Sequence, residues 1–167
     1  MPALICRLFL FIFERNGCKY VVLHYNINRK NSESEVLSVT IILCLDDKNG
    51  LSFNNRRQSR DKTLIEDIMQ NDNVYILERS ACLFTEHSVN KVNNVSDLPD
   101  DAVYFHEITD PKDIIDQFDT VIIYRWNRHY PSDVKFELTM NNYKKIHEEE
   151  FVGFSHDKIT KEVYNKR

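Results

Sequence analysis

Two histidines, His129 and His156, are the residues best suited to acid–base chemistry. His129 lies in a dense polar stretch at 124–133, and His156 lies in a second one at 155–161. Imidazole transfers protons near neutral pH, so two such groups across one groove could cleave RNA without a metal. Positive side chains near the histidines would stabilise the charge that develops on phosphorus: Arg125, Arg128 and Lys158. A small metal-independent ribonuclease is therefore one hypothesis, with Trp126 or Tyr130 stacking a base.

The same polar stretch supports a second hypothesis, a protein-binding surface. Arg125, Trp126, Arg128 and Tyr130 are of the types enriched at interface hot spots, because they combine a large contact area with polar tips. The acidic run Glu148, Glu149 and Glu150 would face a basic partner and repel nucleic acid. In a third interpretation the stretch is only a structural corner, with Trp126 closing the core and the arginines paired to nearby carboxylates.

Most cofactor and metal signatures are missing from the sequence. The chain has 3 Gly and 4 Pro, where average usage gives roughly 12 and 8, and it has no glycine-rich phosphate loop. No two of the six histidines are spaced as local metal ligands, and no cysteines form a C-x-x-C pair. We therefore expect no cofactor, no metal, and four buried free thiols in a reducing cytoplasm: Cys6, Cys18, Cys44 and Cys82.

Charge and hydropathy narrow the choice of partners. The net charge is −4 and the pI about 5.9, which does not fit a general nucleic-acid coat. The only concentrated basic segment is 54–62, NNRRQSRDK, interpreted as a solvated loop. The apolar run at 2–13 is too short to span a bilayer, so a cytoplasmic protein without membrane contact is expected.

The first elements predicted to position these residues are strands. Residues 8–14 and 18–25 flank Asn16 and Gly17, a pair typical of a type I′ turn, and predict a hairpin. Residues 36–45 predict a core strand and 51–53 a short return arm, so this part of the chain would form an antiparallel meander.

A helix and two more strands are predicted before a polar connection. Thr63 and Glu66 match a capping box and predict a helix over 63–70. Strands are expected at 74–77 and 81–84. Residues 85–101 are polar and turn-rich, and any internal connection between halves of the chain would lie there.

The second half of the chain predicts one β-α-β unit over 102–126. A strand at 102–108 leads to Asp110 as N-cap and Pro111 at the first helical position, followed by a helix at 112–118 and a strand at 120–126. The two strands would be parallel neighbours or lie one strand apart.

The C-terminal part is expected to mix a strand and a helix. Residues 134–138 predict a short strand, 141–152 fit either a helix or an edge strand, and an amphipathic helix should run from Ser155. Together the patterns predict a single α+β domain over 1–167, with a mixed, mostly antiparallel sheet and a few short helices.

In size and composition the chain resembles the immunity proteins of bacterial toxin systems, such as those of contact-dependent growth inhibition and of bacteriocins. The resemblance lies in small size, mild acidity, many Asn, Asp, Phe and Tyr residues, and few glycines. It implies a non-enzymatic cytoplasmic protein that inhibits a basic toxin nuclease by binding it. Gly153 falls outside the predicted hairpin turns, so an unusual backbone and a site are expected within 150–158.

Overall fold

The computed structural model describes residues 9–15, 18–24, 38–139 and 142–167. The chain divides into two compact units, 1–36 and 37–167, which we treat separately. In the first, β1 (Phe9–Arg15) pairs antiparallel with β2 (Cys18–His24), which confirms the predicted hairpin. Its turn at Asn16 and Gly17, like Cys6, lies outside the described residues.

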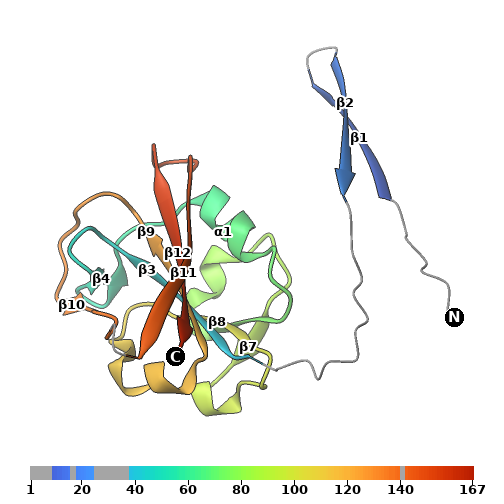
Figure 1. The fold of residues 1–167 in the computed structure, drawn as a ribbon. Helices are drawn as coiled ribbons and strands as arrows, with labels where there is room; N and C mark the ends of the chain where they lie inside the picture. The colour runs from blue at the N-terminus through green and yellow to red at the C-terminus, as the bar shows by residue number, and fades with distance from the viewer. Residues whose placement is uncertain (1–8, 16–17, 25–37, 140–141) are drawn as a thin grey trace, which may run out of the picture. The chain divides into compact units, whose positions relative to one another are not determined.

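A mixed seven-stranded sheet forms the centre of the second unit (Figure 1). Its order is β11-β12-β9-β3-β8-β6-β7. The pairs β9–β3, β3–β8, β8–β6 and β6–β7 are parallel, and only the two pairs that involve β12 are antiparallel. The α+β class is confirmed, but the prediction of a mostly antiparallel sheet is wrong. The strands are β3 (Thr40–Leu45), β6 (Val74–Leu77), β7 (Asn90–Val92), β8 (Val103–Phe105), β9 (Thr120–Arg125), β11 (Tyr143–Phe151) and β12 (Ile159–Lys166).

The expected meander fails because β3 is a central strand of this sheet. It is hydrogen-bonded to β8 on one side and β9 on the other, and Ile41, Ile42 and Leu43 are fully buried. A continuous apolar run is typical of a parallel strand covered on both faces. The expected return arm, β4 (Gly50–Phe53), instead joins a separate small sheet with β5 (Arg56–Arg57) and β10 (Val134–Lys135).

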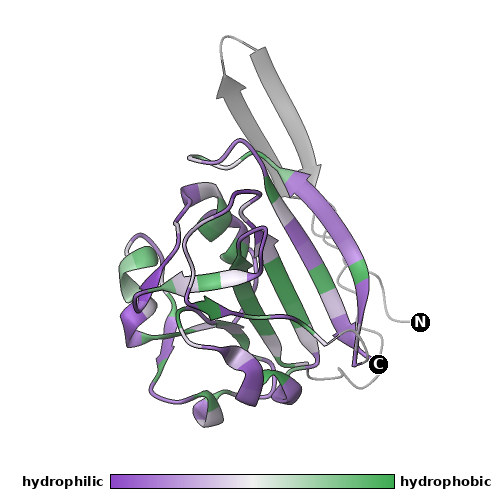
Figure 2. Cartoon of the chain, turned by 90° about the vertical axis from the view of Figure 1, so that its left-hand side faces the viewer, coloured by the Kyte–Doolittle hydropathy of each residue, from purple (hydrophilic) through white to green (hydrophobic). Residues whose placement is uncertain are grey.

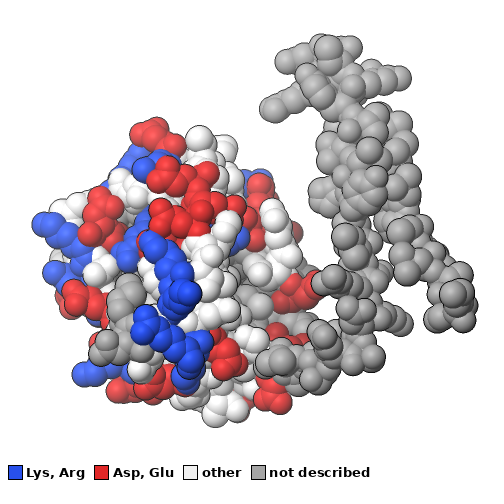
Figure 3. Space-filling view, in the orientation of Figure 1, with Lys and Arg blue, Asp and Glu red and all other residues white. Residues whose placement is uncertain are grey.

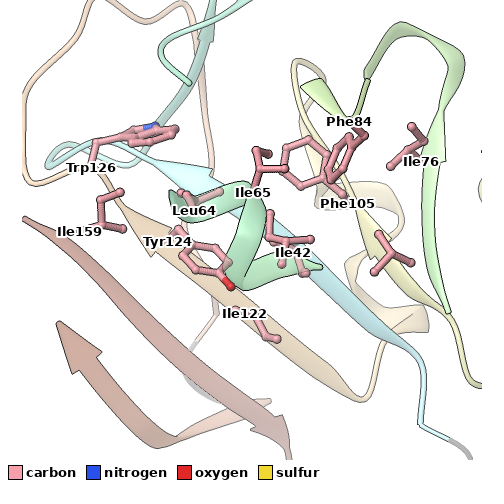
Figure 4. Packing of buried hydrophobic residues seen from close by; sticks show 12 residues of the cluster. Ile42, Leu64, Ile65, Ile76, Phe84, Phe105, Ile122, Tyr124, Trp126 and Ile159 are labelled. Atoms are coloured by element: carbon pink, nitrogen blue, oxygen red, sulfur yellow. The ribbon is translucent and has the colours of Figure 1, made fainter. Parts of the chain in front are cut away.

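One short helix, α1 (Lys62–Ile68), packs Leu64, Ile65 and Ile68 onto the sheet. Figure 4 shows Leu64 and Ile65 pointing toward the side chains of the strands. The helix was predicted, but its cap was not: the side chain of Asp61, rather than that of Thr63, accepts a hydrogen bond from the first turn.

The connection between β6 and β7 is helical. Residues 78–83 form the 3-10 helix η1 (Glu78–Leu83), so the strand predicted at 81–84 is wrong, whereas the strand at 74–77 is confirmed as β6. The polar connection at 85–101 contains β7 and a 3-10 turn, η2 (Val95–Asp97).

The predicted β-α-β unit is present, with β8 and β9 one strand apart on either side of β3. Asp110 caps the connection by accepting a hydrogen bond from the Lys112 amide, and Pro111 begins the helical segment. The predicted two-turn helix is replaced by two 3-10 turns, η3 (Pro111–Asp113) and η4 (Ile115–Gln117).

The C-terminal helix expected from Ser155 is a strand instead. β12 runs between β11 and β9 and buries Ile159 and Tyr164, so backbone pairing on both sides overrides the helical spacing of its apolar residues. β11 is an exposed edge strand, which was one of the two alternatives predicted for 141–152. Figure 2 shows the hydrophobic residues concentrated on the inner strands and an outer strand that is largely hydrophilic.

Surface charge is mixed in sign. Lysines and arginines alternate with acidic residues over the face shown in Figure 3. Of the cysteines whose side chains are described, Cys44 is half-buried and Cys82 is exposed, so the expectation of buried thiols is wrong for Cys82. None of the helices in the described part of the chain is long and apolar enough to cross a membrane.

Candidate active site at the carboxyl edge of the parallel strands

The carboxyl ends of several parallel strands meet at one edge of the sheet, where they line a cavity. Cys44 near the end of β3, Phe105 and Glu107 at the end of β8, and Trp126 after β9 all line it, and α1 closes it with Leu64. This edge is where open α/β sheets bind ligands. The cavity holds only about 20 Å³, room for about one water molecule.

Asp61 is a buried acceptor at the rim of this cavity. Its Oδ1 accepts hydrogen bonds from the backbone amides of Thr63 at 3.0 Å and Phe154 at 2.8 Å. Its Oδ2 accepts hydrogen bonds from the Ser155 amide at 2.7 Å and from His156 Nδ1 at 2.9 Å. Burial alone would raise the pKa of Asp61, but the bonds from His156 and from the Ser155 and Phe154 backbone outweigh it. They hold this pKa well below its usual range.

His156 is buried beside Asp61 and is fixed in orientation. Its ring stacks on Trp126 with centroids 4.7 Å apart and an angle of 27° between the rings. Its Nε2 lies 3.1 Å from the Ser59 hydroxyl and 3.1 Å from the Tyr130 hydroxyl. The imidazole therefore joins a buried carboxylate on one side to two hydroxyl groups on the other.

Gly153 permits this arrangement. A Cβ atom there would lie 2.6 Å from Asp61 Oδ2, closer than real contacts allow. The amide of Gly153 donates to the His156 carbonyl at 2.9 Å, which closes a tight turn beside Asp61. Within the 150–158 segment, the backbone at Gly153 thus lies close to the Asp61 carboxylate, as the expectation of an unusual backbone there suggested.

A second buried carboxylate, Glu107, lies at the same edge. Arg57 binds it in a two-pronged pair, with Nε 2.9 Å from Oε2 and Nη2 2.8 Å from Oε1, and the Ser80 hydroxyl donates to Oε1 at 2.8 Å. Burial alone would lower the pKa of Arg57, but the hydrogen bond to Glu107 outweighs it and raises this pKa. The pair fixes the segment that carries Ser59 to the end of β8.

Next to this small cavity lies an open depression, which we name the arginine groove. It has a volume of about 810 Å³ and is lined by Asn55, Arg56, Arg57, Ser59, Arg60 and Ile108. Arg56 and Arg60 are exposed. Ile108 has a φ of 79°, an unusual backbone conformation for a β-branched residue. Strained backbone of this kind clusters at functional sites.

The predicted site residues separate into different environments. His129 does not join His156: its Nδ1 lies 3.3 Å from Asp46 Oδ2. Arg125 is half-buried and pairs with Glu162 at 3.0 Å, and Arg128 lies 3.6 Å from Asp157.

Of the aromatic candidates, Trp126 and Tyr130 both contact His156, as described above. The acidic run lies on the edge strand β11 and forms ion pairs that are exposed for Glu148 with Lys145 and Glu150 with Lys158, and half-buried for Glu149 with Lys161. A role of any of these residues in partner binding stays a prediction.

Sequence reasoning missed Ser59, Asp61 and Glu107. The signal for the first two was present, since they lie within the only concentrated basic segment, 54–62, interpreted as a solvated loop. Nothing local links that segment to His156, 95 residues beyond Asp61. Within the described residues, no group of three or more His, Cys, Asp or Glu side chains is placed to hold a metal ion.

Comparison with solved structures identifies the fold. Dihydrofolate reductase from Enterococcus faecalis, in complex with NADP(H) and RAB-propyl, matches with a TM-score of 0.58 at 11% sequence identity. The match covers 79% of this chain and 98% of that chain. No protein-family model matches the chain, and no curated protein matches it either.

This fold corrects the functional predictions. The resemblance to toxin immunity proteins is wrong, and with it the toxin-inhibitor function and the basic nuclease partner, because the chain has a dihydrofolate reductase-like fold. The ribonuclease alternative is wrong as well, on the same finding. Size, acidity and scarcity of glycine suggested the resemblance, but none of these properties specifies strand order.

Proposed function

We propose that the chain is an enzyme-type protein that binds a small, phosphate-bearing ligand of nucleotide size in the arginine groove. The observation that carries this proposal is the groove itself, about 810 Å³ in volume and open at the carboxyl edge of the sheet. Ligand sites are typically about 300–1,000 Å³. Guanidinium groups suit phosphate because they donate paired hydrogen bonds and stay charged.

Free arginines are available for this purpose. Arg57 is held by Glu107, but Arg56 and Arg60 are exposed, and within the described part of the chain neither side chain forms an ion pair. The strained backbone at Ile108 forms another part of the wall. The similar dihydrofolate reductase structure was determined in complex with NADP(H), which makes a dinucleotide the first ligand to test.

The residues fit only part of such a cofactor. The arginine groove suits its phosphates, but the small cavity beside it, with about 20 Å³, does not hold a nicotinamide ring. Trp126, on which His156 stacks, lines that cavity. We therefore derive no hydride-transfer step, and the proposal is limited to binding of the phosphate-bearing portion.

Calorimetric titration with NADPH, 2′,5′-ADP and inorganic phosphate tests the proposal. Reversal of two charges in Arg56→Glu/Arg60→Glu should weaken nucleotide binding by at least about a hundredfold, because each lost charge-assisted bond is worth about 1.5–3 kcal/mol. Binding should also weaken as salt is raised.

The matched control is Lys144→Glu, a charge reversal at an exposed position on β11, which should leave the affinity unchanged. Failure of all three ligands to bind at millimolar concentration would overturn the proposal. Equal affinity of the wild type and the double arginine variant would do the same.

A further inference from the structure

Three side chains from distant parts of the sequence form a hydrogen-bonded series in the order carboxylate, imidazole, hydroxyl. Asp61 Oδ2 lies 2.9 Å from His156 Nδ1, and His156 Nε2 lies 3.1 Å from Ser59 Oγ. This is the connectivity of an acid–base–nucleophile triad, which is recognised by geometry and roles rather than by sequence order.

The ionised state of Asp61 fixes the tautomer of His156. An ionised carboxylate can only accept hydrogen bonds, and the hydrogen bonds it receives hold the pKa of Asp61 below its usual range. The Nδ1 atom must therefore carry the proton of the 2.9 Å contact. The lone pair of a neutral imidazole with this tautomer is on Nε2, the atom 3.1 Å from Ser59 Oγ, as a general base requires.

The ring cannot easily turn away from this position. His156 is 3% exposed and lies flat against Trp126, and Asp61 is itself held by the amides of Phe154 and Ser155. The Ser155 hydroxyl lies 3.0 Å from Asp61 Oδ2 and stabilises the carboxylate further. Such rigid support is what a preorganised catalytic base needs.

Ser59 connects this buried pair to the outside. Ser59 is half-buried, its hydroxyl lies 3.1 Å from His156 Nε2, and the residue also lines the arginine groove. Among the side chains that the structure describes, Tyr130 is the one other hydroxyl within hydrogen-bond distance of Nε2, at 3.1 Å, but it does not line the arginine groove. Ser59 is thus the hydroxyl in contact with the base that a ligand in the groove would meet.

We propose that Ser59 is a nucleophile for acyl transfer from small anionic esters, with His156 as general base and Asp61 as the positioning residue. The Ser59 oxygen attacks the ester carbonyl carbon while its proton passes to His156 Nε2. The carbon–oxygen bond to the leaving group then breaks, and the leaving alkoxide takes that proton. Water, activated by His156 in the same way, releases the acid and restores Ser59.

The substrate class follows from the groove. Arg56 and Arg60 line the same groove as Ser59 and would hold a carboxylate or phosphate elsewhere on the ester. Their positive charge would also favour the oxyanion that forms at the carbonyl. The acyl-transfer activity does not require that the groove bind a nucleotide.

Covalent labelling of the whole protein with a neutral fluorophosphonate tests the nucleophile. Peptide mass spectrometry of the wild type should find the adduct on Ser59, formed at least about a hundred times faster than on the exposed Ser96, because a general base contributes about 10²–10⁴ in rate. Both serines are compared within the same folded molecule, so this measurement needs no variant. Equal labelling of Ser59 and Ser96 would overturn the proposal.

Single substitutions test the roles of Ser59 as nucleophile and His156 as general base. Ser59→Ala should abolish the fast adduct and Ser96→Ala should preserve it, while His156→Gln should lower its rate at least about tenfold in protein whose circular dichroism shows it folded. A folded His156→Gln protein that labels at the wild-type rate would contradict the role of His156.

The substrate class is tested with a pair of p-nitrophenyl esters, neutral benzoate and anionic 4-carboxybenzoate, whose rigid para-carboxylate cannot attack its own ester. The anionic ester should acylate Ser59 about tenfold faster, and Arg56→Ala/Arg60→Ala should abolish that preference. Equal rates for the two esters would overturn the assignment to anionic esters. Since the neutral probe does not depend on the arginines, failure of nucleotide binding and failure of the nucleophile can be told apart.

Discussion

Asp61 and His156 are in direct contact, Oδ2 to Nδ1 at 2.9 Å, although 95 residues separate them in the chain. Asp61 caps α1, and His156 precedes β12, so the contact ties the helix to the C-terminal hairpin of the sheet. Both side chains are buried. The pair is therefore at once a structural link and the centre of the candidate site.

Replacement of Asp61 by Asn should destabilise the protein by about 2–4 kcal/mol at pH 7, because several donors lose a charged buried acceptor. The folded-state pKa of Asp61 is lowered relative to the unfolded value of about 4. Its contribution to stability is thus present above pH 4 and lost as the pH falls further.

Urea unfolding of wild type and Asp61→Asn at pH 7, 5 and 3 measures this dependence. The difference in free energy of unfolding should be similar at pH 7 and 5 and smaller at pH 3. A difference that stays constant down to pH 3 would show that ionisation of Asp61 does not contribute.

Gly153→Ala should destabilise the protein by about 1–3 kcal/mol, the usual range for overpacking. The added methyl group would lie 2.6 Å from Asp61 Oδ2 and 2.9 Å from Ile159 Cδ1, so either the turn or the carboxylate must shift. Thermal unfolding measures the effect. The neighbouring Val152→Ala is the control and should change little, because Val152 is 72% exposed; equal effects of the two variants would contradict the close approach.

Glu107→Gln should lower the free energy of unfolding by about 2–4 kcal/mol. The loss should be smaller than for a fully buried ion pair, because Arg57 remains partly exposed. The substitution keeps the shape of the side chain but leaves the Arg57 guanidinium without its counter-charge. The control is Glu150→Gln, whose pair with Lys158 is exposed and screened by solvent, so its loss should change stability far less. Chemical denaturation of both variants measures the contrast, and similar losses would mean that burial of Glu107 does not strengthen its pair.

Local sequence signals were sufficient where neighbouring residues make the contacts. The Asn16 and Gly17 turn signal predicted the β1–β2 hairpin, and Asp110 with Pro111 predicted where the helical connection begins. Strands joined by a helical connection are commonly parallel and close in the sheet, which predicted that β8 and β9 are parallel, although both pair with β3 and not with each other.

Local signals failed where pairing partners are distant. The apolar spacing of Ile159 and Val163 fits a helix, but β12 gains backbone hydrogen bonds from both β11 and β9 and becomes a strand. The run at 40–45 indicated a buried strand, yet it could not specify that β8 and β9 are its parallel neighbours. Strand order therefore remained open, and with it the fold.

The same distinction between local and long-range information applies to the candidate site. The sequence by itself indicated His156 as a reactive side chain and marked Gly153 as unusual, but the segment that holds Ser59 and Asp61 was interpreted as a solvated loop. Only the tertiary structure decided that His156 meets Asp61 and Ser59, while His129 meets Asp46. The reason is that the parallel sheet brings segments almost a hundred residues apart to one edge, and that convergence depends on long-range strand pairing, which residue types and spacing do not encode locally.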